Sequence, residues 1–483
     1  MSLSSLPPEV WIRILGFCSR DDVRRIVSLV SGELNRYANV VLYQSIEWAW
    51  ERLAIERIIR LLTNLMRYPE LGTFVQRIRI RRSDTTFTNT DWTPPRPARH
   101  WAYRTPPEYR DFSQQARSLI FGMDLPDATR WVEEISYGNP YVCVALILGL
   151  CPNVQAMVLD YSFVYMGGWP GRLITAAFRT APRSRTHEIP KFGRLRELEY
   201  GLNVPDVWHA NPQGPFYPSA HPDQFDGLFR LEALQHLAVW LRHPPSLEGT
   251  LNIERLETLC LVRSTIAEQD VEQILRRASR VHTLHLGLIY HRARFQPFRA
   301  AGTPILDGLM AVRNTVHILS IGIEYEAMTY GPRFNQVDST NWGHFRGFLL
   351  RFPHLISVEL PVQMLLGLVS LTHGRRPSLG PLLPPSLLQL IIRLDLCHSQ
   401  GSDEVEPLWG RLSALNSVEN HLRTELDLTP QLKFVTLRSW QWHGYHTNDT
   451  LPVRTALWQQ YRVRLEEQFD RMSPGTVTSV FLI

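Results

Sequence analysis

The chain of 483 residues has few cysteines and no long hydrophobic run. Its five cysteines are odd in number, lie far apart and are mostly embedded in apolar stretches, which fits reduced core thiols better than a disulfide framework. The longest apolar run, YVCVALILGLC at 141–151, is too short to span a bilayer and predicts a buried helix. The amino terminus also lacks a charged region followed by an apolar one. We therefore expect a cytoplasmic or nuclear location, or both, and no membrane partner.

The local motifs of several common enzyme classes are missing as well. The chain contains no GxxxxGK[ST] loop, no HExxH, no GxSxG and no paired CxxC. The sequence therefore lacks the usual local motifs for phosphate binding, zinc-dependent hydrolysis and hydrolysis by a serine nucleophile. His282 and His285 lie three residues apart on a predicted strand, so they would point to opposite faces, which argues against a shared metal. We expect no catalytic residues, no metal and no cofactor.

Lysine is scarce, and the charge is nearly balanced. Lysine and arginine together number 51 against 46 acidic residues, a net charge of +5, and only Lys191 and Lys433 are lysines. A net charge this small argues against a nucleic-acid binder. The stretch RIRIRR at 77–82 places Arg79 and Arg81 on one strand face, where they could touch phosphates. A solvated strand at the edge of a sheet is the simpler interpretation.

The stretch SLPPEVWIRILGFC at 5–18 predicts a helix with two apolar stripes. Val10, Ile14 and Phe17 follow the spacing of one helix face, and a second stripe that includes Leu15 lies about 100° further round. Two further helices are expected, from Ser19 to Val30 and from about 31 to 42. Three helices this short bury too little surface to be stable alone. The simplest explanation is that a partner protein buries the remaining apolar stripe.

These residues resemble a known family. Leu6-Pro7-Pro8-Glu9-Val10, Ile14-Leu15, Val27, Val30, Leu34 and LYQSI at 42–46 resemble the F-box, a three-helix module that docks on a Skp-type adaptor of cullin ubiquitin ligases. Residues 60–82 resemble the segment that joins the F-box to leucine-rich repeats in many fungal F-box proteins. The resemblance implies adaptor contacts by Leu6, Pro7, Pro8, Ile14, Leu15, Val27 and Val30. Because both stripes look alike in sequence, helical core is the competing interpretation for about half of these residues.

Beyond residue 75 the chain repeats one phrase, LxxLxL with varied apolar residues. It occurs nine times, starting at residues 154, 195, 234, 256, 281, 316, 355, 387 and 432. Intervals of 22 to 45 residues leave room for a strand, a turn and a helix. Such strands stack in parallel, bury the apolar positions and turn the intervening side chains toward a concave face. The pattern resembles the degenerate repeats of fungal F-box/leucine-rich-repeat proteins, and an ordinary α/β domain with leucine-rich strands is the alternative.

The predicted fold class is α/β: an N-terminal three-helix F-box followed by an irregular leucine-rich-repeat solenoid of parallel strands, a horseshoe. The predicted boundaries are 1–47 for the F-box, 48–75 for connecting helices and 76–483 for the repeats, with loop insertions at about 83–117, 203–227 and 372–385. Residues expected to face cargo on the concave side are Glu197, Glu199, His236, His285, Glu359 and Arg438, with Trp240 and Trp440 as aromatic anchors just past their strands.

The resemblance implies a substrate-recruiting subunit of an SCF-type (Skp, cullin, F-box) ubiquitin ligase, which holds a cargo protein and does no bond chemistry itself. A non-degradative scaffold and a nucleic-acid binder that uses the arginine-rich insertion are the alternatives. Ubiquitin is joined to lysine amines, and arginine is no substitute because its guanidinium stays protonated. A receptor with two lysines would therefore escape modification in its own complex, although a coding bias toward arginine would explain the same count.

Overall fold

The computed structural model describes residues 6–50, 53–81, 107–179, 186–204, 221–246, 253–291, 304–326, 347–366, 378–394, 411–440 and 462–470. The chain forms two compact units. The first unit comprises Met1–Gly201, Pro218–Leu234 and Pro245–Asn252, and the second comprises Leu202–Tyr217, Gln235–Pro244 and Ile253–Ile483.

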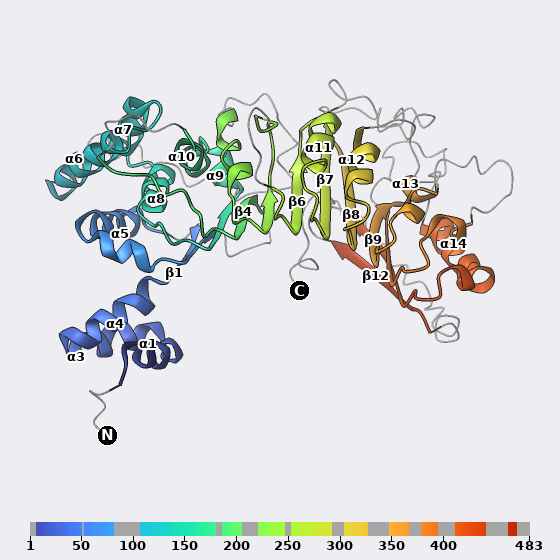
Figure 1. Ribbon diagram of the computed structural model, residues 1–483, viewed down its shortest axis with the longest axis horizontal. Helices are drawn as coiled ribbons and strands as arrows, with labels where there is room; N and C mark the ends of the chain where they lie inside the picture. The colour runs from blue at the N-terminus through green and yellow to red at the C-terminus, as the bar shows by residue number, and fades with distance from the viewer. Residues whose placement is uncertain are drawn as a thin grey trace. The chain divides into compact units, whose positions relative to one another are not determined.

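The first unit begins with a group of short helices, seen together in Figure 1. In order they are α1 (Pro8–Phe17), α2 (Arg20–Asp22), the π-helical turn η2 (Val23–Val27), α3 (Ser28–Val30) and α4 (Gly32–Tyr43). Side chains cap two of the starts, because Ser19 accepts a hydrogen bond from the backbone N–H of Asp22 and Ser31 accepts one from Leu34. These helices fall in the three stretches that the sequence predicts to be helical. Their shared core is small.

Parallel strands follow in the first unit. They are β1 (Ser45–Ala49), β2 (Arg77–Arg81), β3 (Ala156–Asp160) and β4 (Glu197–Leu202), which lie in chain order. In the register of the sheet, Ile78 on β2 lies between Ile46 on β1 and Met157 on β3. All three of these side chains are buried, and they face the helices that cover one side of the sheet. β2 therefore lies inside the sheet, and the prediction that it forms a sheet edge is wrong.

Helices cover the buried side of this sheet. They are α5 (Ile55–Arg67), α6 (Pro107–Gly122), α7 (Ala128–Ser136), α8 (Pro140–Gly149), α9 (Tyr161–Tyr165) and α10 (Trp169–Ala177), with 3-10 turns η4 (Pro69–Phe74), η7 (Pro222–Gln224) and η8 (Leu228–Arg230). Every residue of α8 is buried, which confirms the buried helix predicted from the longest apolar run. Within the described residues no helix combines the length and the apolar character needed to cross a membrane.

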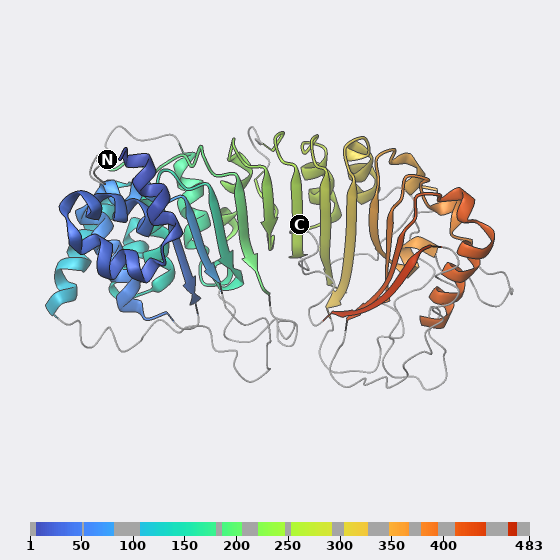
Figure 2. The same ribbon diagram turned by 90° about the horizontal axis from the view of Figure 1, so that it is seen from below.

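The second unit continues the same pattern. Its strands are β5 (His236–Val239), β6 (Thr258–Ser264), β7 (Thr283–His291), β8 (Ile318–Glu326), β9 (Ser357–Pro361), β10 (Gln389–Arg393), β11 (Phe434–Trp440) and β12 (Arg464–Asp470), paired in parallel and in chain order. Its helices are α11 (Glu268–Leu275), α12 (Pro304–Val312), α13 (Val362–Leu366) and α14 (Arg411–Thr424), with 3-10 turns η11 (Leu349–Arg351), η13 (Gly380–Leu382) and η15 (Leu426–Leu428). Figure 2 shows the strands of each unit side by side.

Each of the nine LxxLxL phrases contains a strand that starts at its third residue, from β3 to β11. The fourth and sixth positions are buried, as Leu284 and Leu286 are on β7. The prediction of parallel repeat strands is therefore confirmed. β1 and β12 carry no such phrase, and the sequence did not predict them as strands.

The predicted loop insertions fall partly outside the described residues. In the first, 83–106 lies outside them, and 107–117 is the first part of α6 rather than a loop. In the second and third, 205–220 and 372–377 lie outside the described residues, and the remainder contains η7 and η13. The arginine-rich region proposed to touch nucleic acid, 77–117, is described in part: 82–106 lies outside the described residues, whereas Arg77, Arg79 and Arg81 lie on β2.

Candidate functional site

The N-terminal helices expose a set of large apolar side chains. On α1, Val10, Ile14 and Phe17 are 39%, 41% and 85% exposed. On η2 and α3, Ile26, Leu29 and Val30 are 60%, 79% and 66% exposed. We call these six residues the apolar face. Singly exposed apolar side chains are ordinary on a protein surface, but several on adjoining short helices mark an interaction site.

The opposite sides of the same helices form a core of three buried residues, Leu15, Val23 and Ala38. Four half-buried side chains pack around it: Val27, Tyr37, Val41 and Leu42. Because this core is so small, the helices have little buried surface of their own to offset the entropy of ordering the chain. A partner that covers the apolar face would add the missing burial.

The structure sorts the seven predicted adaptor residues by exposure. Pro7, Pro8, Ile14 and Val30 are exposed, and Leu6 is half-buried. Leu15 is 2% exposed, so its assignment as a surface contact is wrong: its side chain fills the helical core. Val27 packs half-buried against that core. Sequence reasoning missed Val10, Phe17, Ile26 and Leu29, although the spacing of Val10, Ile14 and Phe17 marked a helix face.

Two of the predicted cargo residues lie on β4 in the first unit. Glu197 is exposed and Glu199 is half-buried, whereas Leu198 between them is buried on the helix side of the sheet. Burial raises the pKa of Glu199, and the positive charges of Arg79 and Arg81 on β2 act against that rise. The side of β4 that carries Glu197 and Glu199, which the sequence predicts to be polar, is therefore accessible to solvent.

The remaining predicted cargo residues lie in the second unit, and most of them are buried. His285, Glu359, Arg438 and Trp240 are 1–3% exposed, and His236 is half-buried. The prediction that these four buried side chains line an open surface is therefore wrong. Trp240 does directly follow β5, as predicted. Trp440 is the last residue of β11 rather than a residue past it, and its side chain lies outside the described part of the chain.

The buried polar residues of the second unit are joined by hydrogen bonds across neighbouring strands. Glu359 accepts hydrogen bonds through Oε1 from Arg393 Nη1 at 2.6 Å and Arg438 Nη1 at 2.7 Å, and through Oε2 from Ser320 Oγ at 3.0 Å. Ser320 Oγ also lies 2.8 Å from His285 Nδ1. We call these five residues the buried polar ladder.

The electrostatics of this ladder are those of a structural element. Burial acts to raise the pKa of Glu359, but the charges of Arg393, Arg438 and His285 outweigh it and hold the pKa at about 2. Glu359 is therefore ionised near neutral pH, and with so low a pKa it is a weak base. With Ser320 between His285 and Glu359, the three do not form the nucleophile–base–acid order of a hydrolase. The ladder joins the strands from β7 to β11 through buried hydrogen bonds.

A second buried histidine lies between a hydroxyl and a carboxylate. His421 Nε2 is 2.7 Å from Thr429 Oγ1, and His421 Nδ1 is 3.3 Å from a carboxylate oxygen of Glu425. Both His421 and Thr429 are 0% exposed, so no substrate can reach the hydroxyl. Glu425 also accepts hydrogen bonds from Ser378 and from the backbone N–H of Gly380. This arrangement fastens the end of α14 to the segment before η13.

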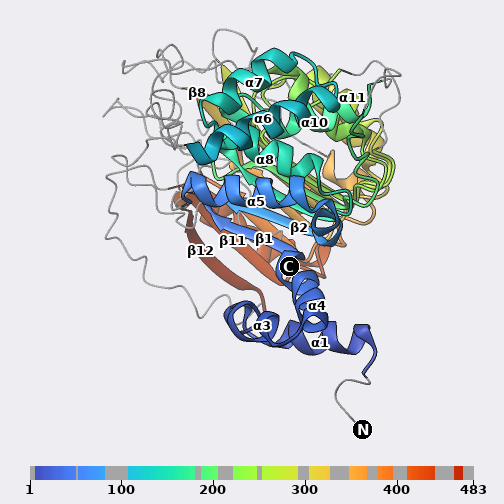
Figure 3. The same cartoon turned by 90° about the vertical axis from the view of Figure 1, so that its left-hand side faces the viewer.

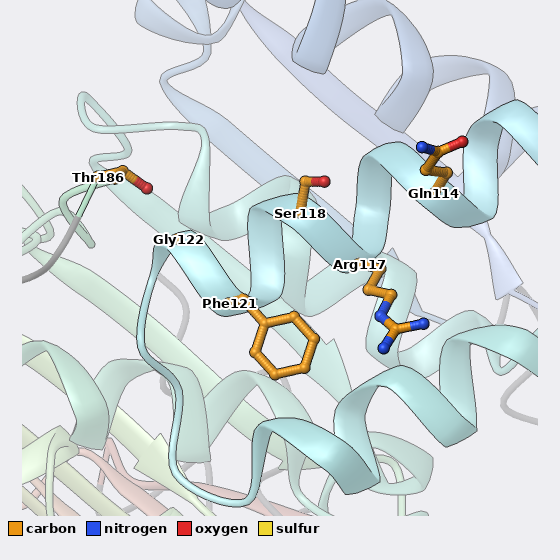
Figure 4. Close-up of a pocket in the computed structure, with 6 residues that line it drawn as sticks. All are labelled: Gln114, Arg117, Ser118, Phe121, Gly122 and Thr186. Carbon is orange, nitrogen blue, oxygen red and sulfur yellow. The ribbon is translucent and has the colours of Figure 1, made fainter.

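An open hollow of about 710 Å³ lies beside α6 in the first unit (Figure 4). Its lining residues are Gln114, Arg117, Ser118, Phe121, Gly122 and Thr186. The Arg117 guanidinium lies 5.7 Å from the centre of the Phe121 ring. A ligand site needs polar groups that converge on one point. Among the described lining residues, Arg117 is the one charged side chain, beside the polar Gln114, Ser118 and Thr186. Among the described residues, no group of three or more His, Cys, Asp or Glu side chains is placed to hold a metal.

Comparison with known proteins adds no family: no protein-family model and no curated protein matches the chain. The first unit therefore has two candidate binding surfaces, the apolar face of the N-terminal helices and the polar side of its strands.

Proposed function

We propose that the chain is a substrate-recruiting subunit of an SCF-type ubiquitin ligase. In this proposal the N-terminal helices are an F-box that binds a Skp-type adaptor and, through it, a cullin. The parallel strands are irregular leucine-rich repeats, and they hold a cargo protein so that its lysines reach the charged ubiquitin. The chain itself carries out no bond chemistry.

The apolar face is the observation that carries this proposal. It consists of six large apolar side chains on α1, η2 and α3, and the helices beneath them share only a small core. Burying one such side chain is worth roughly 1.5–3 kcal/mol when it is fully covered. Association costs about 4–15 kcal/mol, so the six side chains would supply a large part of the binding energy, and polar contacts around them would have to supply the rest. Because residues 6–46 resemble the F-box, we propose a Skp-type adaptor as the partner.

The strands support the second half of the proposal. In the second unit, from β5 to β11, each LxxLxL phrase adds one strand that pairs with the strand of the previous phrase. Repeat architectures of this kind present long surfaces suited to binding other proteins.

The test is co-purification of the full chain with a Skp-type adaptor. Phe17→Ser and Leu29→Ser should together abolish adaptor recovery, because buried apolar anchors carry most of the energy of an interface. Both residues are at least 79% exposed, so the exchange should leave folding intact. The matched control is Phe121→Ser, another exposed aromatic residue in the first unit, on α6. Unchanged adaptor recovery with the Phe17 and Leu29 variant would refute adaptor docking through the apolar face.

A further inference from the structure

Side chains at equivalent strand positions differ in solvent exposure between the two units. In the second unit Ser320 is the third residue of β8 and Glu359 the third residue of β9, and both are buried in the polar ladder. In the first unit the third residue of β2, Arg79, is exposed, and so are its neighbours on the same face, Arg77 and Arg81. A partner that contacts the polar side of the strands therefore finds charged side chains available on β2.

We propose that this open surface binds an extended acidic segment of a partner protein, laid along β2. We call the surface the strand face and define it by Glu47, Arg77, Arg79, Arg81, Glu197 and Glu199. If the chain recruits substrates as proposed above, the acidic segment belongs to the cargo; only that role, and not the binding itself, rests on the proposed function.

The three arginines form a regular row. Burial alternates along β2, so that Ile78 and Ile80 point into the core and the arginines point outward. Alternate residues of a strand lie about 6.6–6.8 Å apart. Within the described part of the chain, no side-chain hydrogen bond or ion pair joins these arginines to another residue. Their positive charge is therefore available to a ligand.

The position of β2 decides how a ligand can bind. β1 and β3 pair with it on both sides, so its backbone groups are already used and a peptide cannot be added to it as a new strand. Figure 3 shows α5 and α8 on one side of β1 and β2 and the N-terminal helices α1, α3 and α4 toward the other. On that second side Arg77, Arg79 and Arg81 are exposed, so their side chains can reach a ligand. The ligand must therefore lie on the strand face and be held by side chains.

The charges beside β2 favour a peptide over a nucleic acid. Glu47 on β1 lies opposite Arg79 in the register, and Glu197 and Glu199 lie on β4 beyond the apolar residue Val158 of β3. Since strands are about 4.8 Å apart, the positive row is one strand wide with negative charge on each side. A nucleic-acid duplex is much wider than one strand spacing and carries phosphates on both strands, so its phosphates would meet these carboxylates. An extended peptide with an acidic side chain at every second residue presents one line of carboxylates at the repeat of the arginines.

The experiment measures fluorescence anisotropy of a labelled peptide, Glu and Thr in strict alternation over nine residues, titrated with the full chain. The variant carries R77E, R79E and R81E. An exposed ion pair contributes roughly a factor of two to five in affinity, so losing three should weaken binding about tenfold to a hundredfold. The control R57E with R60E changes exposed arginines on α5 and should bind as the parent does. Because Glu47 lies opposite Arg79, charge reversal also places like charges side by side. A second variant, R77Q with R79Q and R81Q, adds no negative charge; it should also lose binding, and its thermal unfolding and that of the control should match the parent.

Two further ligands test whether binding depends on the spacing of the carboxylates and on the ligand being a peptide. A peptide of the same composition with its glutamates in one block should bind more weakly, because consecutive side chains of an extended segment point to opposite sides. A single-stranded oligonucleotide should also bind more weakly. Equal affinity of the parent and the triple variant for the alternating peptide would overturn the proposal. So would tighter binding of the oligonucleotide that the triple variant loses, because the strand face would then be a nucleic-acid site.

The outcome is separable from that of the adaptor test. The triple variant should retain adaptor recovery, because β2 carries none of the apolar face. Peptide binding by a chain that fails to bind the adaptor would support the strand face and refute the recruiting role. Adaptor binding without peptide binding would refute the strand face alone.

Discussion

Replacing Glu359 by glutamine should strongly destabilise the second unit. Glu359 is 3% exposed, and its carboxylate accepts hydrogen bonds from Arg393 and Arg438, which are 2% and 1% exposed. Glutamine keeps the volume but removes the negative charge that both guanidinium groups share. Breaking a buried ion pair by removing one partner costs about 3–5 kcal/mol. The fall of the Glu359 pKa to about 2 from its ordinary 4.5 corresponds to roughly 3 kcal/mol in favour of the ionised form.

Urea unfolding of the full chain, followed by circular dichroism, measures this cost. Glu359→Gln should lower the free energy of unfolding by about 3–4 kcal/mol. The control is Glu197→Gln on β4, an exposed glutamate whose exchange should change stability by less than about 0.5 kcal/mol. Replacing Glu359, Arg393 and Arg438 together by leucine, leucine and methionine should restore much of the loss, because apolar residues can substitute for a buried ion cluster. A Glu359→Gln variant as stable as the parent would show that the ladder contributes no stability. Because of this expected cost, a charge change at Glu359 cannot serve as a test of cargo binding.

Three further predictions concern stability and accessibility. Because the folded-state pKa of Glu359 lies below its ordinary value, its contribution to stability should be present above about pH 4.5 and be lost as the pH falls toward about 2; acid titration of the unfolding free energy should show this loss in the parent and not in Glu359→Gln. Leu15→Ala should cost about 2–4 kcal/mol in the N-terminal helices, whereas Phe17→Ala should change their thermal unfolding little, and equal effects would contradict the assignment of the two stripes. Cys18 is exposed and should react with a thiol reagent in the native chain, whereas Cys143 is buried with its pKa raised to about 12 and should react only on unfolding; mass spectrometry of labelled peptides distinguishes them.

The strands of the repeats could be predicted because their signal is local. In each LxxLxL phrase the fourth and sixth residues must be buried together, and residues two apart share one side of a strand. β1 and β12 could not be found in this way. β12 is rich in charged residues, RLEEQFD, and its pairing depends on β11 beside it rather than on a pattern of its own. β2 was recognised as a strand, but its place inside the sheet depends on β1.

The two apolar stripes of α1 and the alternating polarity of β2 and β9 follow from residue spacing alone. The two stripes are equally apolar, however, and Leu15 points inward and Ile14 outward because of where η2 and α4 pack in the folded chain. The tertiary structure also decided that Arg79 is exposed and Glu359 buried, although both are the third residue of a strand. Local spacing sets which side of a strand a residue occupies. What covers that side depends on residues far away in the sequence, and therefore so do its burial, its charge state and its use as a binding surface.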